Sequence, residues 1–302
     1  MTTSPSLQGR PGAVGAMLFR KILFATDFSE SCGAMVPQVQ DMARRCEAQV
    51  ILLHAFYAVQ GYNLPECLDL VPAGRPSMPM SYVEPVARIR DQELEKLQRL
   101  REHFTDLDCD IVMVDGEPET VIRRTAEREN VDLVMMPTRG LGTFRRLLLG
   151  SVTAKVLHDV PCAVFTSAHE RDPASRRPVG YQSIICAVEF NDEAFTVLET
   201  AKRFAQMCCA KLAVVHIRQR HLTAPTDADA DRLISAFKQR IGGGASIHVV
   251  GDGVADGIRR AAIEEAADLV VVGRGNDQAA IARLWSDLYE IIRESPCPVL
   301  SV

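Results

Sequence analysis

Several features that would place the chain in a familiar class are missing from its sequence. No uninterrupted apolar run approaches the roughly 18 residues that cross a bilayer, so we expect no contact with a membrane. Basic residues are not in surplus: 39 acidic side chains against 34 basic ones give a net charge of −5, so a nucleic acid is not expected as a partner. The N-terminus has no sustained apolar block and therefore does not read as a signal peptide.

The sequence also lacks the short motifs of common enzyme classes. It contains neither the G-x4-G-K-[ST] loop of P-loop ATPases nor the G-x-S-x-G elbow of α/β-hydrolases. Its nine cysteines form no C-x-x-C pair and no Cys/His set with metal-ligand spacing. We therefore expect no bound metal, and reduced, mostly buried thiols in a cytoplasmic protein. His54 and His216 have no companion at ligand spacing either, and are expected to be packed or hydrogen-bonded.

What the chain does have is a sequence unit that occurs twice. With 302 residues and 47% hydrophobic side chains, it is long enough for two globular domains. The apolar segment around Ile22 recurs around Ile184 at an offset of 162, and the segment around Asp132 recurs around Asp268 at an offset of 136. We expect four regions: a flexible tail over residues 1–19, a first domain over 20–167, a linker over 168–181 and a second domain over 182–302.

Each copy alternates short apolar strands with amphipathic helices. The strand-like runs have no polar alternation, which is typical of strands covered by helices on both faces. The alternation predicts two α/β domains, each with an open, doubly wound, five-stranded parallel sheet. Residues 57–90 break the pattern with five prolines and predict an irregular excursion, which is either a lid or contact surface or a tolerated insertion.

The segment over residues 137–160 carries the most chemical information. It follows an apolar strand and contains a glycine-rich stretch that leads into a helix predicted to begin near Gly150 and Ser151. A helix N-terminus offers unpaired amide donors and about half a positive charge, so it favours an anion such as a phosphate. Arg139 adds positive charge, and the hydroxyl groups of Ser151 and Thr153 add donors. The alternative is that the glycine-rich stretch is only a tight connection.

A second group of candidate residues follows the first two strands. In an open α/β sheet, ligands bind outside the carboxyl ends of the strands, where the strand order reverses. The first strand is predicted to end at Ala25, Thr26 and Asp27, which places a carboxylate where it could meet a ribose hydroxyl or a purine edge. The second strand ends near His54 and Ala55, whose backbone groups could form a wall around a base.

These residues give the chain a resemblance to the universal stress protein family, in its tandem form, over about residues 20–167 and 182–302. Nucleotide-binding members of that family have G-x2-G-x9-G-[ST] after the fourth strand, and here Gly140, nine residues, Gly150 and Ser151 match the spacing. Asp27, in the segment TDFSE, matches the family's acidic residue after the first strand. Pro137 departs from the pattern because it replaces the first glycine, which removes an amide donor and fixes φ.

The resemblance implies a strand order of 3-2-1-4-5 in each sheet, as in the adenine nucleotide alpha hydrolase-like fold, and an internal pseudo-dimer paired through the last strands. It also implies ATP, with Mg²⁺ as an accompanying ion, in the first half. Adenine would lie near Ala25, Ala55 and Met136, ribose near Asp27 and Gly140, and the phosphates at the helix start. The expected site residues are Ala25, Thr26, Asp27, Ala55, Met136, Pro137, Arg139, Gly140, Gly150, Ser151, Val152 and Thr153.

The second copy keeps the fold pattern but not the residues of the expected site. Trp285 aligns with Gly150, where an indole would fill the phosphate position, and Glu189 replaces Asp27. The first copy has three arginines here, Arg139, Arg145 and Arg146, whereas the second copy has two, Arg274 and Arg283. We therefore expect a degenerate second half that serves as a structural or regulatory partner of the first.

The sequence thus predicts a cytoplasmic ATP-binding protein of stress response or signalling, with the first half as the binding site. No catalytic residue is assigned, because the motif has no evident general base for attack by water, and any ATPase activity is expected to be slow. The alternative is a protein that binds no nucleotide and works through its surfaces. An unidentified protein partner is expected in either case, and the internal pseudo-dimer could pair further into a homodimer.

Overall fold

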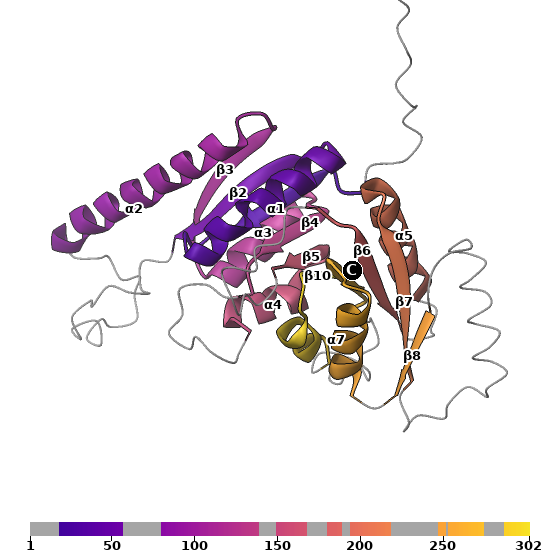
Figure 1. Cartoon of the computed structure of the whole chain (residues 1–302). Helices are drawn as coiled ribbons and strands as arrows, with labels where there is room; N and C mark the ends of the chain where they lie inside the picture. Colours follow the sequence, from indigo (N-terminus) through magenta and orange to yellow (C-terminus); the bar gives the residue numbers. More distant parts are fainter. Residues whose placement is uncertain are drawn as a thin grey trace, which may run out of the picture.

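The two copies fold into one continuous ten-stranded sheet. The computed structural model describes residues 18–56, 80–138, 149–167, 180–188, 194–218, 247–251, 253–274 and 287–302. Within these residues the strand order is β3-β2-β1-β4-β5-β10-β9-β6-β7-β8. Figure 1 shows the sheet passing from the indigo and magenta strands of the first half to the orange and yellow strands of the second.

Strands and helices alternate along both halves. The elements of the first half are β1 (Lys21–Ala25), α1 (Glu30–Cys46), β2 (Gln49–Phe56), α2 (Met80–Arg101), the short 3-10 helix Glu102–Phe104, β3 (Cys109–Asp115), α3 (Pro118–Glu129), β4 (Leu133–Met136), α4 (Ser151–Asp159) and β5 (Ala163–Thr166). Those of the second half are β6 (Ser183–Val188), α5 (Ala194–Cys208), β7 (Lys211–Arg218), β8 (Ile247–Gly251), α7 (Val254–Glu264), β9 (Leu269–Val272), a helix over 287–294, and β10 (Val299–Ser301).

The strand order confirms the predicted topology. The first half has the order 3-2-1-4-5 with every neighbour parallel, and the second half repeats it as β8-β7-β6-β9-β10. The halves meet where β5 pairs with β10 in the antiparallel direction, with Phe165 opposite Leu300. The repeat ends therefore pair as the resemblance implied, and they join the two predicted sheets into one.

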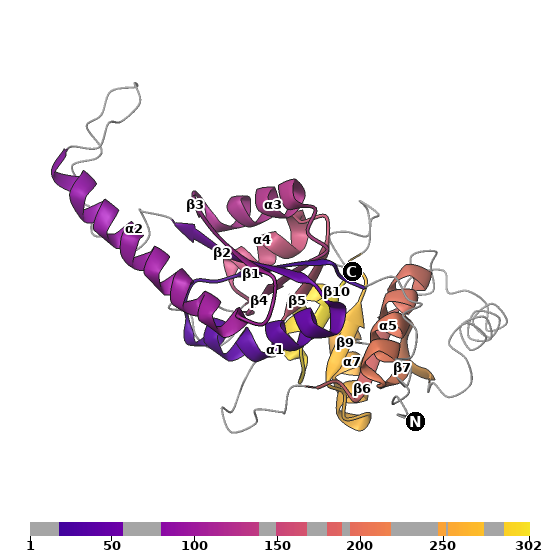
Figure 2. The same ribbon diagram turned by 90° about the horizontal axis from the view of Figure 1, so that it is seen from above.

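Two hydrophobic cores lie on opposite faces of this sheet, because successive residues of a strand point to opposite sides. On β1, Ile22 and Phe24 belong to the core beneath α1 and α5, whereas Leu23 and Ala25 belong to the core beneath α3, α4 and α7. Figure 2 shows α1 on one side of the first-half strands and α3 and α4 on the other. Each core contains residues of both halves, so the halves share their packing.

One aspartate performs the same structural task in each half. The Asp132 carboxylate accepts the backbone N–H groups of Arg20 and Lys21 at 2.8 and 3.0 Å, just where β1 begins. At the offset of 136, the Asp268 carboxylate accepts the N–H groups of Gln182 and Ser183 at 2.8 and 3.1 Å, where β6 begins. Asp132 directly precedes β4 and Asp268 directly precedes β9. Each carboxylate therefore joins the start of one central strand, β1 or β6, to the start of the neighbouring strand.

The predicted irregular excursion is shorter than expected. The prediction for residues 57–90 is wrong for residues 80–90, which belong to α2. The later part of α2 is anchored by Leu97, which is fully buried against the sheet. Residues 57–79 lie outside the described part of the chain.

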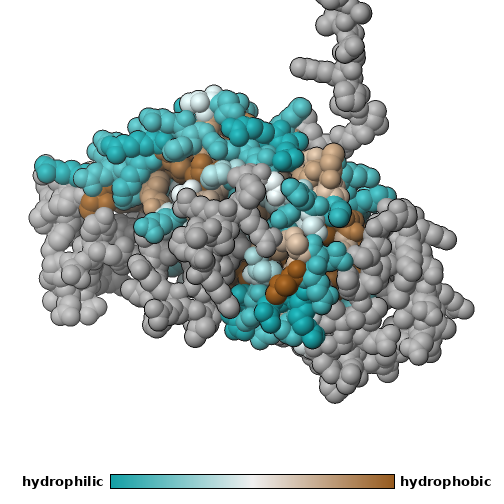
Figure 3. All heavy atoms as spheres, viewed as in Figure 1, coloured by the Kyte–Doolittle hydropathy of each residue, from teal (hydrophilic) through white to brown (hydrophobic). Residues whose placement is uncertain are grey.

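The described residues leave little large hydrophobic side-chain surface exposed. In Figure 3 most of the surface over α1 and α2 is hydrophilic, and among the described residues the one large hydrophobic side chain that is strongly exposed is Ile263, on α7. In the same part of the chain, no helix combines the length and the apolar character that a membrane crossing requires.

Buried thiols predict a loss of stability at alkaline pH. Burial raises the pKa of Cys46 and Cys162 from the ordinary 9.0 to about 11, so the unfolded chain releases these protons at lower pH than the folded chain. The stabilisation is complete below about pH 9 and is lost as pH rises to about 11. Denaturant unfolding at pH 8 and pH 10.5 should show a smaller fall for the double variant Cys46→Ala, Cys162→Ala than for the natural chain. An equal fall in both proteins would contradict the assignment.

Candidate functional site

The candidate site lies at the edge of the sheet where β1, β2 and β4 end. Ala25 ends β1 beside Leu53 of β2, and the Thr26 N–H donates to the Leu53 carbonyl at 2.9 Å. Phe24 of β1 lies beside Met135 of β4, so the following residue, Met136, reaches the same edge as Ala25. The structure therefore brings together the predicted adenine contacts on β1, β2 and β4. Arg139 and Gly140 lie outside the described residues.

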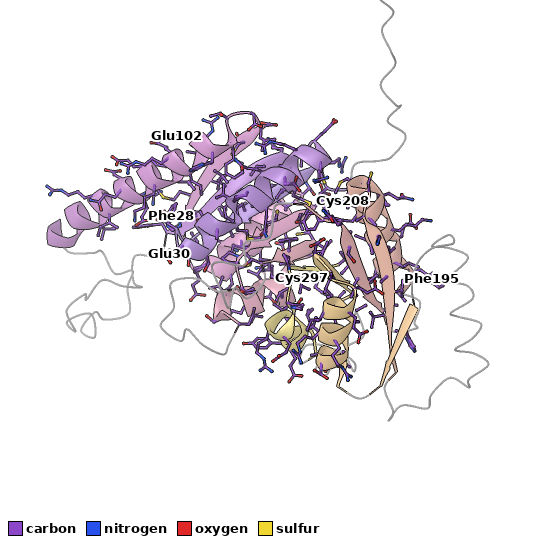
Figure 4. The ribbon with its side chains drawn as sticks, viewed as in Figure 1. Phe28, Glu30, Glu102, Phe195, Cys208 and Cys297 are labelled. Atoms are coloured by element: carbon purple, nitrogen blue, oxygen red, sulfur yellow. The ribbon has the colours of Figure 1, made fainter. Side chains whose placement is uncertain are left out.

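The turn between β1 and α1 holds the Asp27 side chain in one orientation. One carboxylate oxygen, Oδ1, accepts the Ser29 N–H at 3.0 Å and the Cys32 thiol at 3.2 Å. Burial, followed by the negative charge of Asp27, raises the pKa of Cys32 to about 11, so the thiol stays protonated and acts as the donor. Phe28, between Asp27 and Ser29, adopts a φ of 59°, and this left-handed conformation turns the chain sharply into α1. Figure 4 shows Phe28 and Glu30 at this turn.

His54 ties this turn to β2 and α2. Its Nδ1 lies 2.9 Å from the Thr26 carbonyl oxygen, its ring centroid lies 4.6 Å from that of Phe28, and its Nε2 lies 3.9 Å from the Glu93 carboxylate on α2. The predicted hydrogen-bonded role of His54 is confirmed. Glu93 was not identified from the sequence, since a lone glutamate on an amphipathic helix carries no signal of what it faces. The site edge is thus supported by α2, the helix that follows residues 57–79.

Two of the predicted phosphate donors at the start of α4 already form hydrogen bonds within the protein. The Gly150 N–H donates to the Thr138 carbonyl at 3.0 Å, and the Thr153 hydroxyl donates to the Pro137 carbonyl at 3.2 Å. These two bonds join the residues that follow β4 to the first turn of α4. The predicted phosphate contacts through the Gly150 amide and the Thr153 hydroxyl are therefore already used in this conformation.

Three predicted donors at the same helix start have no acceptor among the described residues. The first four amides of an α-helix have no partner within the helix, and the first intrahelical bond here runs from Ala154 N–H to the Gly150 carbonyl at 2.9 Å. The amides of Ser151, Val152 and Thr153 precede it, and no described residue accepts from them. Ser151 is exposed and Val152 is half-buried, so the outer part of this turn meets solvent.

The equivalent edge of the second half is arranged differently. Gly273 follows β9 where Pro137 follows β4, and a Cβ at this glycine would come within 2.9 Å of Val197 on α5. The next residue, Arg274, donates to the carbonyl of Val160 in the first half at 2.9 Å, so its charge serves the contact between the halves. Glu189, Arg283 and Trp285 lie outside the described residues. Among the described residues of either half, no three His, Cys, Asp or Glu side chains are grouped so that they could hold a metal ion.

Comparison with known proteins identifies the fold and its repeat. The model of the universal stress protein family matches residues 18–166 and again residues 180–302. A curated relative, "Universal stress protein in QAH/OAS sulfhydrylase 3'region" from Thermus aquaticus, is 28% identical over 148 residues, which cover 49% of this chain and 97% of that protein. The crystal structure of a universal stress protein from Archaeoglobus fulgidus DSM 4304 has a TM-score of 0.68 at 20% identity and covers 94% of this chain and 96% of that one.

A further match is a universal stress protein solved in complex with cAMP. It is 21% identical, covers 41% of this chain and 97% of its own, and has a TM-score of 0.33, so it carries no argument about where a ligand lies here. The two family-model matches together span most of the chain and divide it as the sequence repeat does. The chain belongs to the universal stress protein family and carries two of its domains in tandem.

Proposed function

We propose that the first half binds ATP or a related adenine nucleotide, with the phosphates at the start of α4. The observation that carries the proposal is the set of amides of Ser151, Val152 and Thr153, which have no acceptor among the described residues. They stand at the N-terminus of a nine-residue helix, where the helix dipole adds about half a positive charge. Such a terminus suits a phosphate group, and Gly150 and Ser151 complete the spacing of the family's nucleotide motif.

The neighbouring strand ends suit the rest of a nucleotide. Ala25 and Ala55 have small side chains, which would let a flat base approach the ends of β1 and β2, and Met136 on β4 would add an apolar contact. Asp27 is held at the end of β1, where its carboxylate could accept ribose hydroxyl or purine amino protons. One universal stress protein has been solved in complex with cAMP, so an adenine nucleotide is a ligand of at least one family member.

We propose binding, rather than turnover, as the activity. The His54 Nδ1 is hydrogen-bonded to the Thr26 carbonyl, and Asp27 accepts from Ser29 and Cys32, so both groups already serve the shape of the turn. A nucleotide held in this way would act through the conformation it stabilises, as expected of a stress-response or signalling binder. Mg²⁺ would enter with the triphosphate, since no three side chains of the metal-binding types are grouped among the described residues.

A second candidate function is favoured by the bonds at the base of α4. Because the Gly150 amide and the Thr153 hydroxyl already have acceptors, this turn is partly satisfied without a ligand. A protein that binds no nucleotide and contacts a protein partner through its surface would have the same feature. The two functions differ in one direct result, which is the heat released when ATP is added.

A charge introduced at Ser151 tests the nucleotide site. Ser151→Glu places a carboxylate in the first turn of α4, where it should leave stability unchanged or raise it by about 0.3–1 kcal/mol. The same carboxylate should compete with phosphate for the amides and repel it, so we expect ATP affinity to fall at least about tenfold. Ser151→Gln has nearly the same shape without the charge and serves as the matched control.

Calorimetric titration with ATP and AMP, together with thermal unfolding, checks this prediction. The proposal requires heat with the natural chain, a moderate loss with Ser151→Gln, which lacks the serine hydroxyl, and a larger loss with Ser151→Glu that is greater for ATP than for AMP, because ATP carries more phosphate charge. No heat with the natural chain would favour the surface-interaction function. Equal ATP affinities of Ser151→Gln and Ser151→Glu would show that the phosphates do not bind at the start of α4.

A further inference from the structure

Helix α4 is held at its N-terminal side by a residue of the second half. The Tyr289 hydroxyl, from the helix over 287–294, donates to the Leu149 carbonyl at 3.1 Å. Leu149 is buried and directly precedes Gly150, the N-cap of α4. The bond therefore fixes the backbone just before the amides that would meet the phosphates.

The other end of α4 is held by Arg274, which follows β9. Its Nη1 donates to the carbonyls of Val160 and Leu157 at 2.9 and 3.3 Å, and its Nη2 donates to the carbonyl of Cys162. The last carbonyls of a helix have no partner within it, and a positive charge near them is favourable. The Arg274 backbone N–H itself donates to the Val302 carbonyl at 2.9 Å, so the guanidinium extends from a fixed position.

The two repeats do not make these contacts reciprocally, because the first half has different residues at the equivalent positions. At the offsets of 135 and 136, Tyr289 corresponds to Ala154 and Arg274 corresponds to Thr138. An alanine has no polar group, and a threonine is too short to reach several carbonyls, so the first half has no equivalent pair to offer the second. Among the described residues, the second half thus holds the helix of the candidate site, and the first half has no equivalent contacts at these two positions.

We propose that Tyr289 and Arg274 are positioning residues of the nucleotide site, through which the second half sets the pose of α4 and hence the affinity of the first half. A helix of nine residues gains little stability from its own hydrogen bonds and depends on its tertiary contacts. Because coupling between two sites is reciprocal, nucleotide at α4 should also tighten the contact with the second half. This inference rests on the proposed function, since it names what controls the same site.

The test combines a local measurement without nucleotide and a binding measurement. Tyr289→Phe removes one hydroxyl from a half-buried ring, and Arg274→Met removes the donors while keeping much of the length. The control is Ser301→Ala, which also removes one hydrogen bond between the halves, from Ser301 Oγ to the Val164 carbonyl at 3.2 Å, but at the β5/β10 junction. Arg274→Lys keeps the charge with fewer donors and should give an intermediate result.

We expect deuterium exchange over residues 149–159, without nucleotide, to be about three- to tenfold faster in Tyr289→Phe and Arg274→Met than in the natural chain, and unchanged in Ser301→Ala. The ATP dissociation constant should rise by a similar factor in the same two variants, with Arg274→Lys between them and the natural chain. Should Arg274→Met fail to fold, Tyr289→Phe provides both measurements.

The outcomes separate this proposal from the proposed function. Unchanged exchange over residues 149–159 in Tyr289→Phe would overturn the positioning role, whatever the affinity. Faster exchange with unchanged ATP affinity would overturn control of the site by these residues. Faster exchange in a chain whose natural form takes up no ATP would leave the positioning of α4 standing and remove the nucleotide function.

Discussion

Replacing Phe165 with alanine is expected to lower the free energy of unfolding by about 3–5 kcal/mol and to destabilise both halves together. Phe165 is fully buried in β5, beside Met135 of β4 and opposite Leu300 of β10. Its ring belongs to a core that includes residues of both halves. The cavity left by alanine would therefore weaken packing on both sides of the junction.

Denaturant unfolding followed by two probes checks this expectation. Deuterium exchange over β6 (Ser183–Val188) reports on the second half, although the substitution is in the first. Circular dichroism reports on both halves. We expect the two probes to give one shared transition that moves to lower denaturant in Phe165→Ala. Ile263→Ala, at an exposed position, should change the stability by less than about 0.5 kcal/mol. A β6 transition that stays in place while the other probe moves would show that the halves unfold separately.

Removing the carboxylate of Asp132 or Asp268 should have the second-largest effect on stability. Each accepts two backbone N–H groups at the start of a central strand, and hydrogen bonds to a charged acceptor contribute more than neutral ones. We expect Asp132→Ala and Asp268→Ala each to cost about 1–3 kcal/mol, because two backbone N–H groups lose a charged acceptor and one of them in each half is partly buried.

The asparagine variants provide the matched controls for this prediction. Asn keeps one acceptor oxygen of the same reach but no charge, so Asp132→Asn and Asp268→Asn should lose clearly less stability than the alanine variants. Denaturant unfolding of all four proteins measures the differences. If the Asp132 variants were destabilised and the Asp268 variants were not, the shared role of the two aspartates would be disproved.

Much of the fold could be predicted because the repeat shows each element twice. The apolar strands around Ile22 and Ile184 have the same pattern, and β1 and β6 are both central strands of their halves. Asp132 and Asp268 were matched by position, although nothing in a sequence shows which backbone groups a carboxylate accepts. The predicted excursion over residues 57–90 extends too far because its five prolines obscure the helical spacing that leads to Leu97.

The candidate site could be predicted less completely for a physical reason. Helix start, strand ends and glycine spacing are local features, so Ala25, Asp27 and Ser151 could be assigned from short segments. The bonds that occupy the Gly150 amide and the Thr153 hydroxyl depend on how the chain returns from β4 to α4. Tyr289 and Arg274 act on α4 from more than a hundred residues away, at positions where the repeat is not symmetric.

The antiparallel contact of β5 with β10 has a consequence for assembly. Two separate single-domain proteins that met through such strands would come apart on dilution, whereas two copies in one chain meet at an effective concentration set by their connection. Pairing here is thus insensitive to how much protein a cell contains. It also leaves β3 and β8 as the outer strands of the described sheet, so a larger assembly built on the described residues would use those strands or the helical faces.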